Sequence, residues 1–429
     1  MNDLQVKKLE VWSKLISGTV IKVGELAQNK QGVYFQYQID YLNNYQNISP
    51  FNLKFDSSLQ LAPKKPHNGL HGAFSDSLPD GWGLLLMDRI FRKSDILPAQ
   101  ITAMDRLAFV GKRAMGALSY QPGSALQQSD NSDQISIAEI GLQAQAIFDG
   151  QTTEVLQVLV NAGSSGGARP KAQLYLKETD TKMCSTSLAK GLEPYLVKFT
   201  SSQLALKHEE GLCEAAYLTM AHKAGIDVPR WRLLDAPQNS GAKKWLALKR
   251  FDTIKNVDGS EGRLHLHSAS GLLDADYRMP SLDYEDLIKA TSMLCKSPAA
   301  GQAIFRRMVF NLFALNQDDH SKNWAFLQQD NGQWQLAPFY DVTFSPSPYN
   351  EHVTAFVGFG KNPSLKAMQR LANQANFSSW NHAQKVIEEV LDSINHFAKI
   401  ATELEVEQKT INLIKKQHNA VFLENELLL

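Results

Sequence analysis

Alternating apolar and polar positions predict strands in the first part of the chain. In GVYFQYQIDYL, Val33, Phe35, Tyr37 and Ile39 share one face of an extended segment, with tyrosine and glutamines on the other. SDSLPDGWGLLLMDRIFR predicts a loop followed by a helix, and RAMGALSYQPG predicts a strand that ends in a Pro-Gly turn. The first 120 residues are therefore expected to be rich in β-structure.

Helical periodicity dominates after about residue 282. One predicted helix face, with the i, i+3, i+4, i+7, i+8 spacing, consists of Phe305, Met308, Val309, Leu312 and Phe313. A looser version recurs over residues 387–394. The polar segment QPGSALQQSDNSDQIS, residues 121–136, predicts a domain boundary. The pattern indicates an α+β protein with a helical C-terminal part.

Composition narrows the class of protein. The 429 residues include 43% hydrophobic and 21% charged residues, which is typical of a globular chain. Lysine plus arginine (44) balance aspartate plus glutamate (44), so a protein that grips DNA by itself is not expected. Cys184, Cys213 and Cys295 lie far apart with no C-x-x-C spacing, which favours a reducing compartment. With no signal-like or membrane-spanning run, we expect a cytoplasmic protein without membrane partners.

The first candidate site is the glycine-rich segment NAGSSGGARPKAQLYL. Gly163, Gly166 and Gly167 precede Lys171, and small residues let backbone N–H groups approach an anion that a lysine then neutralises. The spacing is not that of a P-loop. A flexible turn between two elements is the alternative.

The second candidate is Lys198, inside the strand-like run EPYLVKFT. In protein kinases, a strand lysine paired with a helix glutamate holds the ATP phosphates. Glu209, Glu210 and Glu214 follow on a predicted helix, and Glu214 fits its register best. The alternative is a lysine that points outward from an edge strand. KWLALKRFD predicts a third strand that leads into a hinge.

The third candidate is LNQDDHSKNWAFL. Asp318 and Asn323 have the D-x-x-x-x-N spacing of a kinase catalytic loop, and Asp341 follows beyond a hairpin that turns at residues 330–332. There the first aspartate accepts a hydroxyl proton, and the asparagine and second aspartate bind magnesium. A metal hydrolase built on Asp318, Asp319 and His320 is an alternative, but no second cluster supports it. The isolated HLH at residues 265–267 is more typical of histidines in a strand than of metal ligands.

Five ordered motifs, SSGGARPKAQL, YLVKF, KRFD, NQDDHSKNWAFL and LAPFYDV, together resemble the HipA family of bacterial serine/threonine kinases, the toxins of toxin–antitoxin pairs. The resemblance implies an α+β, two-lobed protein-kinase-like fold with an N-terminal β-rich subdomain and a mostly helical C-terminal lobe. The expected parts are a HipA-type subdomain (1–122), a linker (123–136), a nucleotide-binding lobe (137–252) and a helical catalytic lobe (253–429).

The same resemblance implies ATP and Mg²⁺ as cofactors and assigns roles by motif. Asp318 is the expected catalytic base, Asn323 and Asp341 the metal ligands, and Glu214 the partner of the phosphate-binding lysine. Nucleotide contacts are expected from Ser165, Gly166, Gly167, Lys171, Lys198, Lys249, Phe251, His320 and Lys322. Ser164, with Ser165 adjacent, is the expected autophosphorylation site, whose phosphate would repel the ATP phosphates.

The implied partner is a small HipB-like helix-turn-helix antitoxin, with DNA reached only through it. The implied substrate is a translation-related protein such as an aminoacyl-tRNA synthetase. Two alternatives stay open at the level of sequence: a catalytically silent kinase-like nucleotide-binding protein or co-repressor, and a kinase for a hydroxyl acceptor that is not a protein.

Overall fold

The computed structural model describes residues 5–126, 134–151, 159, 166–180 and 182–428. By its internal contacts the chain forms two compact units. Unit 1 comprises residues 1–204, 232–274 and 327–333, and unit 2 comprises residues 205–231, 275–326 and 334–429. None of the helices in the described part of the chain is long and apolar enough to cross a membrane.

Unit 1 contains a five-stranded antiparallel sheet in the order β4-β3-β2-β1-β5. The predicted alternation is confirmed at Val33, Phe35 and Tyr37, which are buried in β3. It is wrong at Ile39, which is 63% exposed at the start of a helix because pairing with β2 ends at Tyr37. The strands are β1 (Lys8–Lys14), β2 (Val20–Gln28), β3 (Val33–Tyr37), β4 (Gln60–Leu61) and β5 (Leu118–Gln121).

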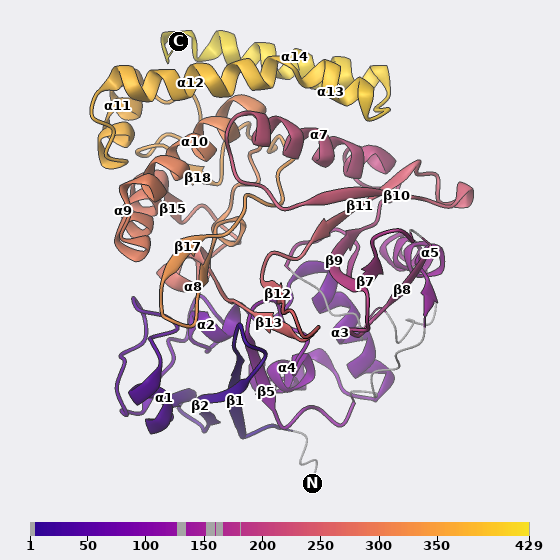
Figure 1. Ribbon diagram of the computed structural model, residues 1–429, viewed down its shortest axis with the longest axis vertical. Helices are drawn as coiled ribbons and strands as arrows, with labels where there is room; N and C mark the ends of the chain where they lie inside the picture. Colours follow the sequence, from indigo (N-terminus) through magenta and orange to yellow (C-terminus); the bar gives the residue numbers. More distant parts are fainter. Residues whose placement is uncertain (1–4, 127–133, 152–158, 160–165, 181, 429) are drawn as a thin grey trace. The chain divides into compact units, whose positions relative to one another are not determined.

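A second sheet of unit 1 has six strands in the order β10-β11-β9-β7-β8-β6, and β9 pairs antiparallel with both neighbours (Figure 1). Its apolar positions pack with Trp82 and Leu86 of helix α3 into one core. The strands are β6 (Ile135–Ser136), β7 (Lys171–Lys177), β8 (Met183–Ser185), β9 (Leu192–Lys198), β10 (Trp231–Asp235) and β11 (Lys244–Lys249).

The helices of unit 1 include the one predicted after the loop around Pro79. This helix, α3, buries Trp82, Leu86, Met87, Ile90 and Phe91 along one face. The helices are α1 (Ile39–Asn44), α2 (Gly72–Ser75), α3 (Gly81–Lys93), α4 (Ala103–Val110), α5 (Ile137–Phe148) and α8 (Ala269–Leu273).

Short strands complete unit 1, namely β12 (Thr253–Lys255), β13 (Glu261–Arg263) and β14 (His265–Ser268). The HLH histidines lie in β14, as predicted. His265 Nε2 lies 2.8 Å from the Ile48 carbonyl oxygen, and His267 lies 2.6 Å from the Asp76 carboxylate. Both rings are buried and take part in packing within unit 1.

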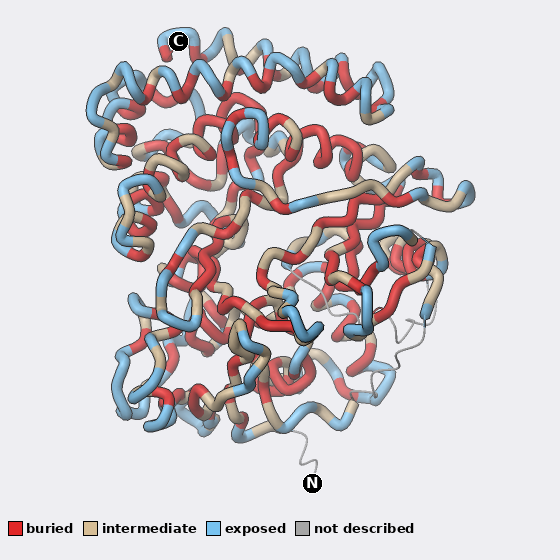
Figure 2. Tube along the Cα trace, viewed as in Figure 1, coloured by how far each residue is buried: buried red, intermediate tan, exposed pale blue. Residues whose placement is uncertain are grey.

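Unit 2 is mainly helical, and all five apolar residues predicted for the helix face at 305–313 are buried in α10. Buried and exposed positions alternate along its C-terminal helices (Figure 2). The helices are α7 (Glu210–Lys223), α9 (Tyr284–Cys295), α10 (Pro298–Ala314), α11 (Leu365–Gln374), α12 (Trp380–Asn395), α13 (Phe397–Glu403) and α14 (Gln408–Glu424). The strands are β15 (Leu282–Asp283), β17 (Trp334–Leu336) and β18 (Thr354–Ala355), and β16 (Ala325–Gln328) leads into the predicted hairpin turn.

The core of unit 2 holds a histidine that makes stability depend on pH. His418 of α14 is buried, with Nε2 2.9 Å from Tyr217 Oη, and burial lowers the pKa of His418 from 6.5 to about 4. As pH falls between these values, only the unfolded chain takes up the proton. We expect this group alone to remove about 3 kcal/mol of unfolding free energy over that range.

Urea unfolding of the full chain at several pH values measures this effect. In the His418→Gln variant the unfolding free energy should decrease less as the pH falls below 6.5. In the His382→Gln variant, changed at an exposed position of α12, it should decrease as in the native chain. If the unfolding free energy of the two variants depends on pH in the same way, His418 is not the group responsible.

Candidate active site

Two lysines lie side by side in the six-stranded sheet. Lys171 at the start of β7 is the direct partner of Lys198 at the end of β9, so their side chains share one face. Both residues are buried, and Lys171 Nζ donates a 2.6 Å hydrogen bond to the Gly166 carbonyl oxygen. The edge-strand alternative for Lys198 is wrong, because β9 lies between β7 and β11. Like charges directly opposite each other on one face of a sheet are unfavourable, and a bound polyanion would offset that repulsion.

The glycine-rich segment contacts the start of α3. Asp80 precedes the helix but makes no side-chain capping bond there; instead its carboxylate accepts a hydrogen bond from the Gly167 N–H. The Trp82 N–H donates to the Gly167 carbonyl (3.1 Å), and the Trp82 indole donates to the Lys171 carbonyl (2.8 Å). Gly81, with a φ of 40°, has no room for a side chain, since a Cβ would lie 2.7 Å from Ala168 Cα.

These contacts identify residues that the sequence analysis assigned only to a loop and a helix. Asp80 and Trp82 hold the described end of the glycine-rich segment, 87 and 89 positions away in sequence. The sequence feature that could have indicated this contact is the aspartate directly before Gly-Trp-Gly. Ser164 and Ser165 lie outside the described residues.

The predicted hinge follows β11. Lys249 lies 2.9 Å from the Glu193 carboxylate, which Lys255 also contacts at 2.8 Å. Burial alone would raise the pKa of Glu193, but the hydrogen bonds from both lysines outweigh it and lower this pKa. The Lys249 ammonium therefore has a partner within unit 1. The contact of Lys249 and Phe251 with adenine stays a prediction.

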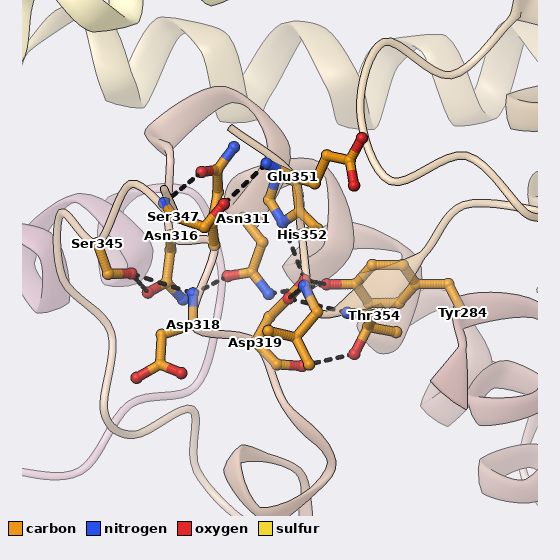
Figure 3. Close-up of polar contacts among 12 residues, drawn as sticks. Tyr284, Asn311, Asn316, Asp318, Asp319, Ser345, Ser347, Glu351, His352 and Thr354 are labelled. Atoms are coloured by element: carbon orange, nitrogen blue, oxygen red, sulfur yellow. Dashed lines mark hydrogen bonds and ion pairs between the residues drawn. The ribbon is translucent and has the colours of Figure 1, made fainter. Parts of the chain in front are cut away.

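The catalytic-loop candidate in unit 2 is held through its main chain. The Asn323 amide donates to the Asp318 carbonyl oxygen (2.6 Å), and the Asp318 N–H donates to Ser345 Oγ (3.2 Å). The Asp318 side chain is 60% exposed, and its carboxylate points away from the network of dashed contacts in Figure 3. His320 Nε2 lies 3.8 Å from Asp318 Oδ1. Asp318 thus has a fixed backbone and an accessible carboxylate.

Asp319, the next residue, has the opposite environment. Its buried carboxylate accepts hydrogen bonds from the Tyr284 hydroxyl and the Thr354 N–H, and His352 Nδ1 lies 3.0 Å away (Figure 3). The Val353 N–H also donates to this carboxylate. These contacts occupy the carboxylate that the hydrolase alternative would need as a metal ligand. Asp319 therefore anchors the loop, and the sequence analysis gave it no such role.

Asp341 belongs to a segment that is bonded to the same loop. It has a φ of 56°, a left-handed conformation that is uncommon for residues other than glycine but is adopted more often by aspartate than by most. Two residues later, the Thr343 N–H donates to Asn316 Oδ1 (3.3 Å), which also accepts from Ser345 Oγ (3.1 Å). These bonds fix the chain before Asp318 against the chain after Asp341, so unit 2 brings the two predicted functional segments together.

A second contact joins the same two segments. The Tyr340 hydroxyl donates to the Lys322 carbonyl oxygen (2.6 Å). The Lys322 ammonium lies 4.4 Å from the centre of the Tyr277 ring, and the centre of the His320 ring lies 5.9 Å from the same ring. The two cofactor-contact candidates of the loop, His320 and Lys322, are therefore grouped around one tyrosine.

The three glutamates considered as lysine partners differ in their surroundings. Glu209 contacts the Thr410 hydroxyl and the Glu407 N–H, and Glu210 accepts from the Leu206 N–H. Glu214 is 2% exposed and Glu210 is 5% exposed in the same helix, so burial does not choose between them. Glu214 belongs to unit 2 and Lys198 to unit 1, so their pairing stays a prediction.

The sequence matches two family models and several curated proteins. The sequence matches the HipA N-terminal domain over residues 16–121 and the HipA-like C-terminal domain over residues 163–398. It is 26% identical over 238 residues to "Putative kinase Y4dM" of Sinorhizobium fredii, covering 52% of this chain and 54% of that protein. It is 26% identical over 195 residues to a "Putative kinase" of Haemophilus influenzae, covering 44% of this chain and 54% of that protein. The chain spans about half the length of the curated relatives it matches.

The fold has a counterpart among solved structures. HipA of Shewanella oneidensis MR-1, solved with HipB and its operator DNA, has a TM-score of 0.69 to this chain at 16% identity. The match covers 97% of this chain and 96% of that one, so the predicted α+β, kinase-like fold is confirmed. The C-terminal family match alone extends over more than half of the residues. The chain belongs to the HipA family.

Proposed function

We propose that the chain is an ATP- and Mg²⁺-dependent protein kinase that phosphorylates serine or threonine hydroxyl groups. The observation that carries this proposal is the exposed Asp318 carboxylate beside the buried Asp319. A general base has to reach the hydroxyl of an incoming substrate, whereas a structural carboxylate is consumed by internal donors. Asp318 has the first property and Asp319 the second.

The other residues have roles that follow from their environment. Asp318 accepts the proton of the attacking hydroxyl. Lys171 and Lys198, buried on one face of the sheet, hold nucleotide phosphates, and the adjacent Gly166 and Gly167 let the backbone approach them. Lys322 in the loop is the candidate for a further phosphate contact.

The proposed metal ligands fit magnesium by their chemistry. Asn323 and Asp341 provide the hard oxygen atoms that magnesium prefers, on two segments bonded to each other in unit 2. Within the described ranges, no group of three or more His, Cys, Asp or Glu side chains could hold a metal, but a site completed by phosphate oxygens does not need one. When bound, magnesium would neutralise charge on the transferred phosphoryl group.

The contact between α3 and the glycine-rich segment leads to a testable prediction. Asp80→Ala removes a charge-assisted hydrogen bond to the Gly167 N–H, so ATP affinity should fall by about tenfold or more. Asp80→Asn keeps an acceptor and should restore part of that affinity. Asp88→Ala on the same helix removes a carboxylate that pairs with Arg106 and serves as control. Equal ATP affinities for the Asp80→Ala and Asp88→Ala variants would contradict this role.

The proposed cellular role is that of a toxin in a toxin–antitoxin pair. The Shewanella oneidensis HipA was solved with HipB and operator DNA, and a HipB-like antitoxin is the corresponding partner here. The net charge of zero fits a chain that reaches DNA only through such a partner. The proposed substrates are a translation-related protein, such as an aminoacyl-tRNA synthetase, and the chain's own Ser164 or Ser165.

Phosphate transfer from γ-labelled ATP, with and without Mg²⁺, tests the proposal on the purified chain. Label that requires Mg²⁺ and maps by mass spectrometry to residues 161–171 supports kinase activity and the autophosphorylation site. Label only on an added small molecule would favour the alternative hydroxyl acceptor. ATP binding without any transfer, to the chain or to a bacterial lysate, would favour the silent binding protein.

A further inference from the structure

Unit 2 contains a pocket of about 380 Å³ that the proposed catalytic groups do not line. Its walls are one side of α10 and the residues that follow α7, together with Leu336 of β17, Phe377 after α11 and Val386 of α12. The apolar part includes Ile226, Phe377 and Val386, and the polar part includes Gln302, Arg306 and Arg307. Pockets of this size accommodate small organic ligands.

Arg307 is the unusual member of this pocket. It is 5% exposed, and Nη2 donates a single 2.9 Å hydrogen bond to the Ala337 carbonyl oxygen. Its guanidinium carbon lies 5.4 Å from the centre of the Phe339 ring. The described part of the chain pairs the neighbouring Arg306 with Glu389 but gives Arg307 no ion pair, although a guanidinium carries five N–H donors. Burial lowers the pKa of Arg307 to about 10, while the charge of Asp227 acts in the opposite direction.

Another buried arginine of the same chain shows how such a charge is normally compensated. Arg250 donates to both carboxylate oxygens of Asp252, at 3.0 and 2.6 Å, and also to the Gln173 side chain. Burying a cation without such a partner costs several kcal/mol. Arg307 is one of the residues that line the pocket, and its one hydrogen bond, from Nη2 to the Ala337 carbonyl oxygen, leaves its other N–H groups without an acceptor in the described part of the chain.

The neighbouring charges restrict what this pocket would take. Arg306 is already occupied, since its Nη1 donates to the Ala224 carbonyl (2.7 Å) and to the Glu389 carboxylate (2.6 Å). Asp227, also on the wall, is exposed. Arg307 is therefore the group that selects an anion, and the apolar wall selects a ligand with a hydrocarbon part.

We propose that this pocket is a binding site for a small organic oxyanion, a carboxylate or phosphate monoester with an apolar group, which the Arg307 guanidinium recognises. A guanidinium matches either oxyanion with paired N–H donors. The apolar group packs on Ile226, Phe377 and Val386.

The site is connected to the segment that carries Asp341. Arg307 holds the Ala337 carbonyl and packs on Phe339, while the Phe339 N–H donates to the Asp227 carbonyl on the pocket wall (2.8 Å). A bound oxyanion would shift the guanidinium that supports this segment and thereby change the support of residues 337–341. This regulatory consequence rests on the proposed kinase function, whereas the binding itself does not.

Binding is tested without ATP, by calorimetry and thermal unfolding of the full chain with benzoate and phenyl phosphate as probes. Benzyl alcohol, which has the ring but no charge, is the ligand control. We expect saturable binding of at least one oxyanion, and none of benzyl alcohol. Saturation by phenyl phosphate alone assigns a phosphate site, and saturation by benzoate alone a carboxylate site.

Two variants test the location. Arg307→Met should weaken binding of the oxyanion by about tenfold or more. Ala303→Phe fills the pocket but keeps Arg307, and it should abolish binding of the oxyanion. This second variant keeps the proposal testable if Arg307→Met does not fold. Arg370→Met, at an exposed arginine paired with Glu285, is the matched control. No oxyanion binding to the native chain, or equal binding to the native and Ala303→Phe chains, would overturn the proposal.

Discussion

Asp318→Ala is expected to reduce phosphate transfer by roughly 10²–10⁴-fold, the usual contribution of a positioned general base. The same change should leave folding intact, because the side chain is 60% exposed. The loop is held through the Asp318 main chain, whose N–H and carbonyl groups bond Ser345 and Asn323. Alanine keeps both of these groups. Single-turnover transfer from labelled ATP, together with a urea unfolding curve, measures the two effects on one preparation.

Two further variants distinguish the loss of a catalytic base from other effects of removing a carboxylate. Asp318→Asn keeps the shape of the side chain but not its basicity, so its loss of transfer should match that of Asp318→Ala. Asp392→Ala removes another exposed carboxylate from unit 2 and should transfer at the native rate. Transfer by Asp318→Ala within a few fold of the native rate would exclude Asp318 as the base. Nucleotide binding that survives in this variant would show that the nucleotide site is intact.

Local patterns predicted much of the fold, because burial repeats with the period of each element. The face of α10 and the strand β3 follow this rule, and Lys198 was found because a charge interrupts an apolar run. The error at Ile39 has the same origin. Alternation continues past the end of a strand, and only the loss of pairing with β2 shows that the strand has ended.

The candidate site was predictable only as far as its motifs are local in sequence. Asp318 and Asn323 are five residues apart, and the structure joins them by a hydrogen bond. The partners of Asp80 and Asp319 lie tens of residues away, so no spacing in the sequence indicated them. Arg307 is a further case, because it lies outside the apolar face predicted for residues 305–313 and is nevertheless buried.

Asp319→Ala should have the reverse phenotype of Asp318→Ala. It leaves the Tyr284 hydroxyl and the N–H groups of Val353 and Thr354 without their acceptor, and removes the contact with His352. Each stranded buried donor costs about 1–3 kcal/mol, so the unfolding free energy should fall by at least about 3 kcal/mol. Tyr284→Phe removes one donor and keeps the carboxylate, and should cost about 1 kcal/mol.

Urea unfolding of the two variants measures these losses, and transfer assays below their unfolding midpoints complete the comparison. Because Asp319 fixes the loop rather than touching the reacting atoms, activity at low temperature should recover in the part of the population that stays folded. Asp318→Ala should stay inactive under the same conditions. If Asp319→Ala instead keeps native stability and loses transfer completely, the two neighbouring aspartates have been assigned in the wrong order, and the base is the buried one. The pair thus tests whether accessibility, rather than position in the motif, identifies the catalytic carboxylate.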